Sequence, residues 1–285
     1  MLWIPCLTIH LSVASSWAAT AETSEEREPT SASEPEPVDP YPLLVHLHDN
    51  QDWTGLRTRA LEADLANPDA RYRYLAAVAR VQEEPSEGLG ELEALADTEV
   101  GALASLTIAG IWMDEAPRLA AAQYRAYLDA NPGGAYRSYA ATQEAYALAT
   151  EGRFGMARTA LESEGVAAPP ELLMTLAAPP AWKRPFIASF LSGALPGAGQ
   201  LYAGQPREAA SALLVNALFI SGAVYAARQE QWAALGVIGF FGIGFYTGNV
   251  YGAADAAIRY NRGMRDEVLI EMEEAGLGPQ AAPLP

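Results

Sequence analysis

Cysteine and histidine, the side chains that nucleophilic and metal chemistry most often use, are scarce in this sequence. The chain of 285 residues has one cysteine, Cys6, and three histidines. His46 and His48 lie two residues apart beside Asp49, a spacing that suits a pair of metal ligands on a strand or loop. A metal site needs further ligands, and after residue 21 the chain has no other histidine and no cysteine. We therefore expect no enzyme activity, no metal and no cofactor.

The charge of the chain excludes one large class of partner. It has 18 basic and 35 acidic residues, a formal net charge of −17. A nucleic-acid backbone selects a basic protein surface, so we expect no nucleic-acid binding. Residues 22–182 carry 27 acidic and 11 basic side chains, whereas residues 183–285 carry 8 and 7. This division predicts two regions that meet different surroundings.

The first 42 residues have the composition of a leader and a linker. Residues 2–13 are mostly apolar, and small residues follow up to an A-x-A pattern that ends at Ala21, as is typical of signal-peptide cleavage. No lysine or arginine precedes the apolar stretch, and a buried N-terminal helix is the alternative interpretation. The next 21 residues are rich in Glu, Ser and Pro. We expect a signal peptide over 1–21 and a disordered acidic linker over 22–42.

Helical periodicity runs from about Trp53 to Leu176, and we expect a helical-repeat domain over 43–180. Apolar residues and alanines recur there at a spacing near 3.6, and Gly, Pro and Asn-Pro pairs separate the segments. The Asn-Pro pairs at 67–68 and 131–132 lie 64 residues apart, which is twice 32. This pattern predicts pairs of helices with a period of 32 residues. The residues at equivalent points of the successive second helices are Leu56, Gly88, Ala120 and Ala157.

Such a period is close to that of tetratricopeptide repeats. The stretch AYALATEGRFGMARTALE at 145–162 resembles this family through a small and an aromatic residue on the first helix, a Gly-Arg-Phe turn, and Ala157 at the helix crossing. The resemblance covers about residues 53–165. It implies stacked helix pairs with a concave surface that binds a peptide or a protein.

Tyrosines and arginines of this region are the candidates for partner binding. Tyrosine offers a large contact area at a small entropic cost, and arginine can clamp a carboxylate. The tyrosines considered are Tyr72, Tyr74, Tyr124, Tyr127, Tyr136, Tyr139 and Tyr146. The predicted partner-binding set is Tyr72, Tyr124, Tyr127, Tyr139, Arg125 and Arg137. The alternative is that most tyrosines pack between helices and that the arginines pair with nearby Glu and Asp.

Three runs without a charged residue follow Arg184. They contain 18, 19 and 23 residues, and each is long enough, or nearly so, to cross a hydrocarbon core about 30 Å thick. The runs are 186–203, 209–227 and 232–254. We expect a membrane domain over 183–262 with these spans, followed by a polar helix and tail over 263–285.

The first run contains LPGAGQLYAG at 195–204. With the apolar hairpin that follows and Asp255 just beyond it, this motif resembles small bacterial membrane domains with a P-G-x-G-Q-x-Y-x-G signature. It resembles the two-transmembrane-helix domain family more distantly, and neither resemblance implies an enzymatic role. Proline and glycine allow a helix break whose backbone groups the Gln and Tyr side chains can satisfy, and a lipid or substrate site is the alternative. The motif residues concerned are Pro196, Gly197, Gly199, Gln200, Tyr202 and Gly204.

Gly244, Gly248 and Gly252 recur every four residues in the third run and form a glycine ridge. Such a ridge lets another helix approach closely, so we expect it to be the main packing surface of the bundle, or a contact between copies of the chain in an oligomer. Asn216 and Asn249 need hydrogen-bond partners in hydrocarbon, either each other or the backbone, and an ion path is the alternative. No charged residue lies inside any run, so we do not expect a pump or a proton-coupled transporter.

The basic residues leave the orientation of the membrane domain open. If all three runs span and the repeats are exported, four flanking arginines lie in the cytoplasm and Lys183, Arg184 and Arg228 lie outside. If only the last two runs span and the repeats are cytoplasmic, six bases lie inside and only Arg228 lies outside, which the positive-inside rule prefers. The leader favours export. We therefore predict a bacterial inner-membrane protein with a periplasmic repeat domain.

These features together predict an all-α protein with tetratricopeptide-like helical repeats followed by a two- to three-helix transmembrane bundle. The predicted function is that of a non-enzymatic, membrane-anchored envelope protein whose repeats bind or scaffold a protein or peptide partner, with membrane lipid around the bundle. The alternative is a small membrane transport or lipid-handling module that the repeats regulate. We also expect residues 43–180 to fold alone as a helical monomer.

Overall fold

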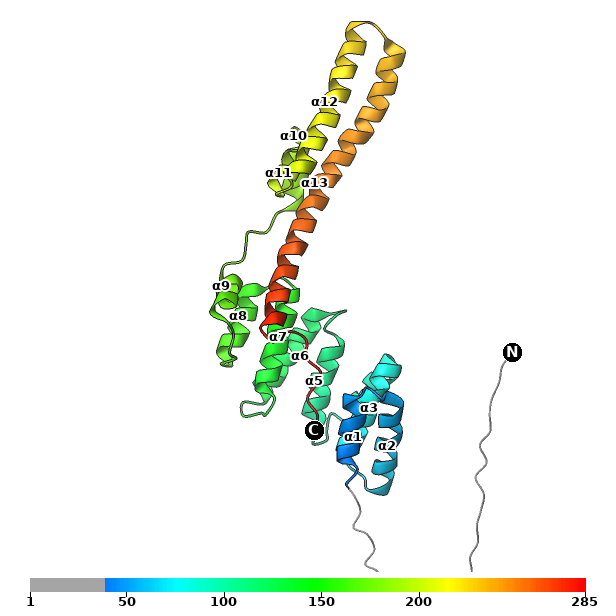
Figure 1. Cartoon of the computed structure of the whole chain (residues 1–285), viewed down its shortest axis with the longest axis vertical. Helices are drawn as coiled ribbons and strands as arrows, with labels where there is room; N and C mark the ends of the chain where they lie inside the picture. Colours follow the sequence, from blue (N-terminus) through cyan, green and yellow to red (C-terminus); the bar gives the residue numbers. More distant parts are fainter. Residues whose placement is uncertain (1–38) are drawn as a thin grey trace, which may run out of the picture. The chain divides into compact units, whose positions relative to one another are not determined.

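The computed structural model describes residues 39–285, and within them it contains thirteen α-helices and no strand (Figure 1). The predicted all-α fold class is therefore confirmed. The predicted signal peptide at 1–21, and the predicted linker up to residue 38, lie outside the described residues. Helix α1 (Tyr41–Asp49) begins inside the range predicted as linker, because a proline in its first turn favours a helix start there.

Nine helices, α1 to α9, make up the repeat region, and each packs against the next. Helices α2, α4, α6 and α8 begin at Trp53, Pro85, Pro117 and Phe154, so their starts are 32, 32 and 37 residues apart, in agreement with the sequence period. The four residues predicted to be equivalent lie in these helices and are buried. The bounds are α2 (Trp53–Ala66), α3 (Ala70–Glu83), α4 (Pro85–Glu93), α5 (Gly101–Ile111), α6 (Pro117–Ala130), α7 (Arg137–Thr150), α8 (Phe154–Ser163) and α9 (Pro170–Ala177).

Local capping explains why the helices begin where they do. Asp52 Oδ1 accepts a hydrogen bond from the backbone of Gly55 at 3.0 Å, at the start of α2. Asp69 Oδ1 accepts from the backbone of Arg71 at 2.7 Å, at the start of α3. Helices α4 and α6 begin with a proline, whose missing N–H has no partner to lose in a first turn. These caps depend on neighbouring residues only and set the period of the repeats.

The repeat region has two hydrophobic clusters, and residues near the far end of the chain contact both of them. The first lies among α1 to α5 around Leu56, Tyr74 and Leu75. The second lies among α5 to α9 and is completed by side chains from beyond the membrane domain. These side chains are Met264, Val268, Met272 and Leu277. The repeat core is therefore larger than the predicted domain of 43–180, because residues 264–277 cap its last helices.

Two helices are long and apolar enough to cross a membrane, α12 (Pro206–Arg228) and α13 (Trp232–Glu274). Their most apolar windows have mean hydropathies of 1.7 and 1.4, and only 17% and 6% of these windows is buried. Side chains such as Leu218 and Phe240, which are 73% and 76% exposed, would form a large apolar surface in water. The two helices, which contain the predicted runs 209–227 and 232–254, are therefore compatible with membrane anchoring.

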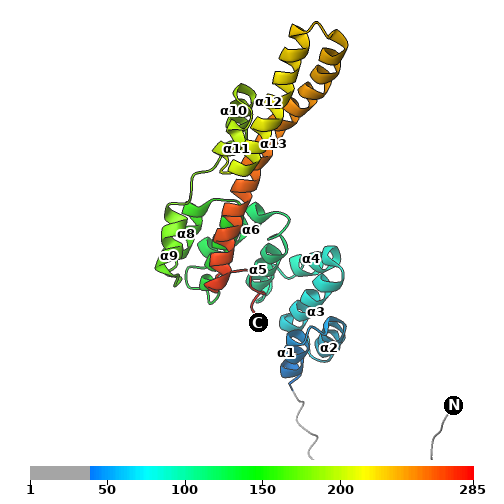
Figure 2. The same ribbon diagram turned by 45° about the horizontal axis from the view of Figure 1, so that its top comes forward.

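Helix α13 is long enough to do more than cross a membrane. It has 43 residues and is about 65 Å long at 1.5 Å per residue, roughly twice the thickness of a hydrocarbon core. Its second half begins at Asp255 and is polar on its outer side. This half, drawn towards red in Figures 1 and 2, runs back to the repeats and packs against α7 and α9.

The first predicted span, 186–203, is not one helix. It divides into α10 (Pro185–Ala194) and α11 (Ala198–Tyr202), because Pro196 and Gly197 interrupt it and Gly197 has a φ of +90°. Helix α10 has ten residues and is about 15 Å long, half of the hydrocarbon core. Of the expected two- to three-helix bundle the structure has the two long helices, and the first run forms a short helix pair that packs beside α13.

Helices α12 and α13 form a hairpin whose turn, residues 229–231, lies at the end away from the repeats (Figure 1). The repeats precede α10, and the segment after α13 contacts them. Both therefore lie at the same end of the hairpin. If α12 and α13 each cross the membrane once, the repeats and the end of the chain share one side. The predicted arrangement, with three spans and these two parts on opposite sides, does not fit this path.

Candidate functional site

The glycines of the LPGAGQLYAG motif permit a tight connection between helices. A Cβ on Gly197 would lie 2.4 Å from the carbonyl oxygen of Ala209. A Cβ on Gly199 would lie 2.0 Å from the carbonyl oxygen of Ala188 and 2.7 Å from Ala253 Cβ. Real Cβ atoms do not approach other atoms so closely. The close approach of α11 to its neighbours therefore requires glycine at both positions.

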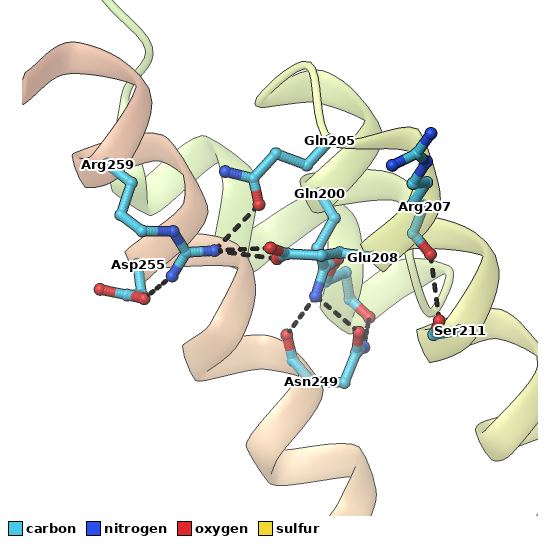
Figure 3. Close-up of polar contacts among 9 residues, drawn as sticks. Gln200, Gln205, Arg207, Glu208, Ser211, Asn249, Asp255 and Arg259 are labelled. Atoms are coloured by element: carbon cyan, nitrogen blue, oxygen red, sulfur yellow. Dashed lines mark hydrogen bonds and ion pairs between the residues drawn. The ribbon is translucent and has the colours of Figure 1, made fainter. Parts of the chain in front are cut away.

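Gln200 is the centre of a buried polar network that joins α10, α11 and α13. Ser192 Oγ donates to Gln200 Oε1 at 2.7 Å and accepts from Gly199 N at 3.0 Å. Gln200 Nε2 donates to Asn249 Oδ1 and to the Asn249 carbonyl oxygen, both at 3.0 Å, as Figure 3 shows. Asn249 Nδ2 donates to the Ser192 carbonyl oxygen at 3.3 Å. Because both amide side chains use their oxygen and their nitrogen, the network stabilises the helix break.

Asn216 is buried outside this network. Its Nδ2 donates to the carbonyl oxygen of Ala212 at 2.8 Å, within its own helix. Asn216 and Asn249 both line a cavity of ≈ 730 Å³ between α12 and α13, whose other walls include Phe240 and Phe241. Each asparagine therefore has an internal partner. A cavity with mainly apolar walls suits a lipid chain better than an ion.

The glycine ridge is not the main helix contact within one chain. A Cβ added at Gly244 or Gly248 would meet nothing within 4 Å, and one at Gly252 would meet only a glutamine nitrogen of the polar network at 3.7 Å. Helices α12 and α13 approach each other instead where Gly242 faces Phe219, at 3.4 Å between the added and existing Cβ atoms. The expected packing role of the ridge is therefore wrong for the single chain, and its use between copies stays a prediction.

An ion-pair cluster lies where α12 begins and the polar half of α13 starts (Figure 3). Arg259 pairs with Asp255 one turn earlier in α13. Arg259 Nη2 also donates to Glu208 Oε2 and to Gln205 Oε1, both at 2.9 Å. These contacts hold the two ends of the hairpin together. Asp255 is thus an ion-pair partner of Arg259.

Tyr202 of the motif lies at the junction between the repeats and the apolar helices α12 and α13. Its hydroxyl accepts a hydrogen bond from the backbone of Arg184 at 3.1 Å. Lys183 Nζ lies 5.0 Å from the centroid of the Tyr202 ring and 5.3 Å from that of Tyr260. Asn261 bonds both the N–H and the carbonyl of Lys183, each at 2.8 Å. Aromatic and basic side chains of this kind are typical of a membrane boundary.

Three of the four predicted partner-binding tyrosines are buried among helices. Tyr72, Tyr124 and Tyr127 are 4%, 0% and 5% exposed. Tyr139 packs edge-on against Tyr124, with 6.2 Å between ring centroids, and its hydroxyl reaches the inner surface of the repeats. Tyr72, Tyr124 and Tyr127 therefore pack between helices, as the alternative interpretation stated. Only Tyr139 of the predicted set faces the groove described below.

Both predicted arginines form ion pairs between helices. Arg125 Nη2 lies 2.7 Å from Glu144 Oε2, and Arg137 Nη2 lies 2.5 Å from Glu164 Oε2. Burial raises the pKa of Glu144 above its ordinary value, and the hydrogen bond from Arg125 offsets only part of this effect. The geometry thus matches the salt-bridge alternative for both residues.

The inner surface of the repeats is a groove that holds the chain's own end, residues 275–285, here called the tail. One face of α7 and its preceding residue present Tyr136, Tyr139, Gln143 and Tyr146, spaced three or four residues apart. This stripe bonds the end of α13 and the tail. The bonds, donor first, run from Tyr146 to Glu273 Oε1 at 2.7 Å, from Gln143 to Gly278 O at 3.0 Å, from Tyr139 to Gln280 O at 3.3 Å, and from Tyr136 to Leu284 O at 3.4 Å.

Two tyrosines of other helices complete the contact. Tyr74 in α3 donates to Pro283 O at 3.2 Å, and Tyr41 in α1 donates to Pro285 O. The tail therefore runs antiparallel to α7 and then crosses towards α3 and α1. Sequence reasoning missed Gln143, Tyr41 and the tail itself. The spacing of the stripe on α7 was the one signal that could have indicated part of this site.

Beside the tail the groove is open. A cavity of ≈ 830 Å³ lies between the tail and the walls formed by His48, Trp53 and Tyr139. The His48 ring packs edge-on against Trp53, with 5.6 Å between centroids, and His46 bonds Asn50. Within residues 39–285 no group of three or more His, Cys, Asp or Glu is placed to hold a metal ion. The groove thus offers aromatic walls and hydrogen-bond donors.

Comparison with known proteins identifies no relative. No family model, curated protein or solved structure matches the chain. The resemblances to tetratricopeptide repeats and to small membrane domains therefore remain predictions from motifs, and function has to be argued from the site itself.

Proposed function

We propose that this chain is a non-enzymatic, membrane-anchored protein whose helical repeats bind a partner protein in the groove. The observation that carries the proposal is the stripe on α7, whose hydroxyl and amide donors are directed at main-chain carbonyl groups. Donors aimed at carbonyls between aromatic walls suit an extended polypeptide. The tetratricopeptide-like arrangement of the helices supports the same kind of partner.

The membrane helices serve as the anchor in this proposal. Helix α13 continues without interruption from its apolar half into the core of the repeats, where Met272 is fully buried. A continuous helix is a stiff connection, so it would hold the groove at a set distance from the bilayer. The polar network around Gln200 would keep the short pair α10 and α11 fixed at the base of this anchor.

We further propose that the repeats and the tail both lie in the periplasm of a bacterial cell, bound to the inner membrane. We choose the periplasmic side because the pattern that ends at Ala21 is typical of a signal peptide for export. Because the tail lies in the groove, it would be exported together with the repeats. The six bases near the repeat end of the hairpin oppose this orientation under the positive-inside rule, so the side needs a direct test.

Photo-crosslinking in cells tests the proposed partner binding. The photoreactive residue p-benzoylphenylalanine replaces Tyr139 in the groove of the full chain, or, as a matched control, Leu65, which is 85% exposed on α2. We expect adducts heavier than the chain from position 139 and none of the same mass from position 65. A chain that gives no heavier adduct from the groove, although it is present in the membrane, would overturn the proposal.

One observation favours a second function, in lipid handling. The cavity between α12 and α13 has mostly apolar walls and is large enough for part of an acyl chain. Substituting Gly248→Leu would place a side chain in this cavity, and its Cβ would meet no atom within 4 Å. If lipid handling is the function, this change should remove lipid that copurifies with the chain and should abolish its cellular role. If the groove carries the function, crosslinking from position 139 should be unchanged.

A further inference from the structure

The tail is held mainly through its backbone. Four of its carbonyl groups accept hydrogen bonds from side chains of the repeats at distances of 3.0 to 3.4 Å. The one backbone N–H that takes part, that of Gln280, donates to Gln143 Oε1 at 3.2 Å. Recognition of carbonyl groups does not depend on which side chains a peptide carries. The same donors can therefore bind another extended segment of similar shape.

The composition of the tail suits a segment that binds without first folding. Residues 276–285 read GLGPQAAPLP and include three prolines. Proline restricts φ to about −65° and has no N–H, so such a segment loses little conformational freedom on binding and needs few acceptors from the groove. Leu284 is the one large side chain after Leu277, and it packs against the cluster among α1 to α5. The bound segment is thus held by backbone hydrogen bonds and by one apolar side chain, that of Leu284.

The negative charge of the repeat region limits which segments the groove can bind. The tail has no charged residue, whereas residues 22–182 carry 16 more acids than bases. Asp49 and Asp114 line the open part of the groove. An acidic segment would be repelled there, and an uncharged or basic one would not.

The donors of the groove keep their protons at neutral pH. Burial raises the pKa of Tyr74 above its ordinary value, and its hydrogen bond with Thr107 offsets this only in part. Burial likewise raises the pKa of Tyr139 and, together with Glu273, that of Tyr146. These phenols therefore donate hydrogen bonds across the physiological range.

The tail fills only part of the groove. The residues from Pro279 to Ala281 are exposed, in contrast to Leu277, which is 5% exposed and belongs to the core. The open cavity lies directly beside this part of the tail. A segment that enters the cavity could displace residues 279–285 and leave the core around Leu277 intact.

We propose that the groove is a binding site for extended, proline-containing segments without acidic side chains, and that residues 279–285 occupy it until a partner's segment displaces them. The proposal rests on the proposed function, because it states what kind of segment the partner contributes. A short tether gives the tail an effective concentration of about 1 mM, so a free segment with equal contacts competes poorly while the tail is present.

The test compares the full chain with a variant that lacks residues 279–285, both in detergent micelles. The probe is the peptide PQAAPLP with an N-terminal fluorophore, and fluorescence anisotropy reports binding. We expect the shortened chain to bind the probe at least about tenfold more tightly than the full chain. A control peptide with alanine at its three proline positions should bind more weakly. Equal binding to both chains, or no binding to a shortened chain that keeps its helical circular dichroism, would overturn the proposal.

Hydroxyl groups can be removed singly to show where the probe binds. Tyr136→Phe and Tyr139→Phe in the shortened chain should each weaken binding several-fold. The control, Tyr127→Phe, changes a buried tyrosine that is not among the hydrogen-bond donors to the tail and should leave binding unchanged. Equal effects at all three positions would assign the loss to the fold and overturn the placement of the peptide.

A second measurement applies if the shortened chain does not fold. In the intact chain, p-benzoylphenylalanine at position 136 should form an internal crosslink to residues 279–285, detected by mass spectrometry of the digested protein. Absence of this crosslink would overturn the proposal. Probe binding without any heavier adduct in cells would leave the groove as a peptide site and would count against the proposed function alone.

Discussion

At position 199 the helices leave no room for a side chain. Because a Cβ there would lie 2.0 Å from a backbone oxygen of α10, Gly199→Ala should force α11 away from its neighbours and disturb the network around Gln200. We expect a loss of about 1 to 3 kcal/mol or more in the free energy of unfolding, measured by thermal unfolding in detergent. The matched control is Gly248→Ala, which meets nothing within 4 Å and should be neutral or slightly stabilising, since alanine favours helices. Similar losses at both positions would contradict this account of the motif.

The ionisation of Glu144 makes the stability of the fold depend on pH. Burial raises the pKa of Glu144 in the folded chain, so its protonated form is the one that the fold favours. The contribution of Glu144 to stability is therefore present below its unfolded pKa and is lost as the pH rises through the folded value. Glu144→Gln, which stays neutral, should match the parent in melting temperature near pH 4 and exceed it near pH 7. Glu162→Gln, at an exposed position, serves as the control and should show no such divergence.

At the scale of elements, α13 belongs to two environments. Its first half presents apolar side chains such as Phe240 outward, and its second half buries Met264, Val268 and Met272 in the repeat core. The polar network and the cluster around Arg259 lie between the two halves. The helix thus connects the packing of the apolar helices to the packing of the last repeats. Stability of the repeats should depend on it.

Truncating the buried face of α13 tests this dependence. Met272→Ala removes a side chain with 0% exposure from the core and should cost about 2 to 5 kcal/mol, while Ile270→Ala, at 53% exposure, should cost less than about 0.5 kcal/mol. Thermal unfolding of the full chain in detergent measures both. For the same reason residues 43–180 alone should be less stable than the full chain. Equal stability of the two alanine variants would show that α13 does not cap the repeats.

For the molecule as a whole, the path of the chain predicts its topology. Reporter fusions after Ala178 and after residue 285 should report the same side of the membrane, and a fusion inside the turn at 229–231 should report the opposite side. Export of the first two would agree with the leader, and cytoplasmic activity of both would show that the flanking bases decide. Opposite sides for the first two would contradict the hairpin and restore a third span.

The sequence alone determined those features that depend on neighbouring residues. The starts of α2, α4 and α6 follow from caps and prolines within one turn, so the 32-residue period was visible without a structure. The apolar length of α12 and the helix break at Gly197 are equally local, because chain length and backbone conformation decide them. Which tyrosines reach the groove does not depend on neighbouring residues alone. Tyr124 and Tyr139 look alike in sequence, but one is enclosed by helices and the other reaches the groove.

Only the tertiary structure decided which distant segments within residues 39–285 meet. Gln143 and Gly278 are 135 residues apart, and Tyr41 and Pro285 are 244 apart. Contacts over such separations depend on how the repeats curve and on where α13 meets them. The spacing of nearby residues does not determine either of these. The glycine ridge shows the same limit, because its spacing indicates a smooth surface but not whether another helix covers it. The groove and its occupant therefore follow from packing rather than from sequence pattern.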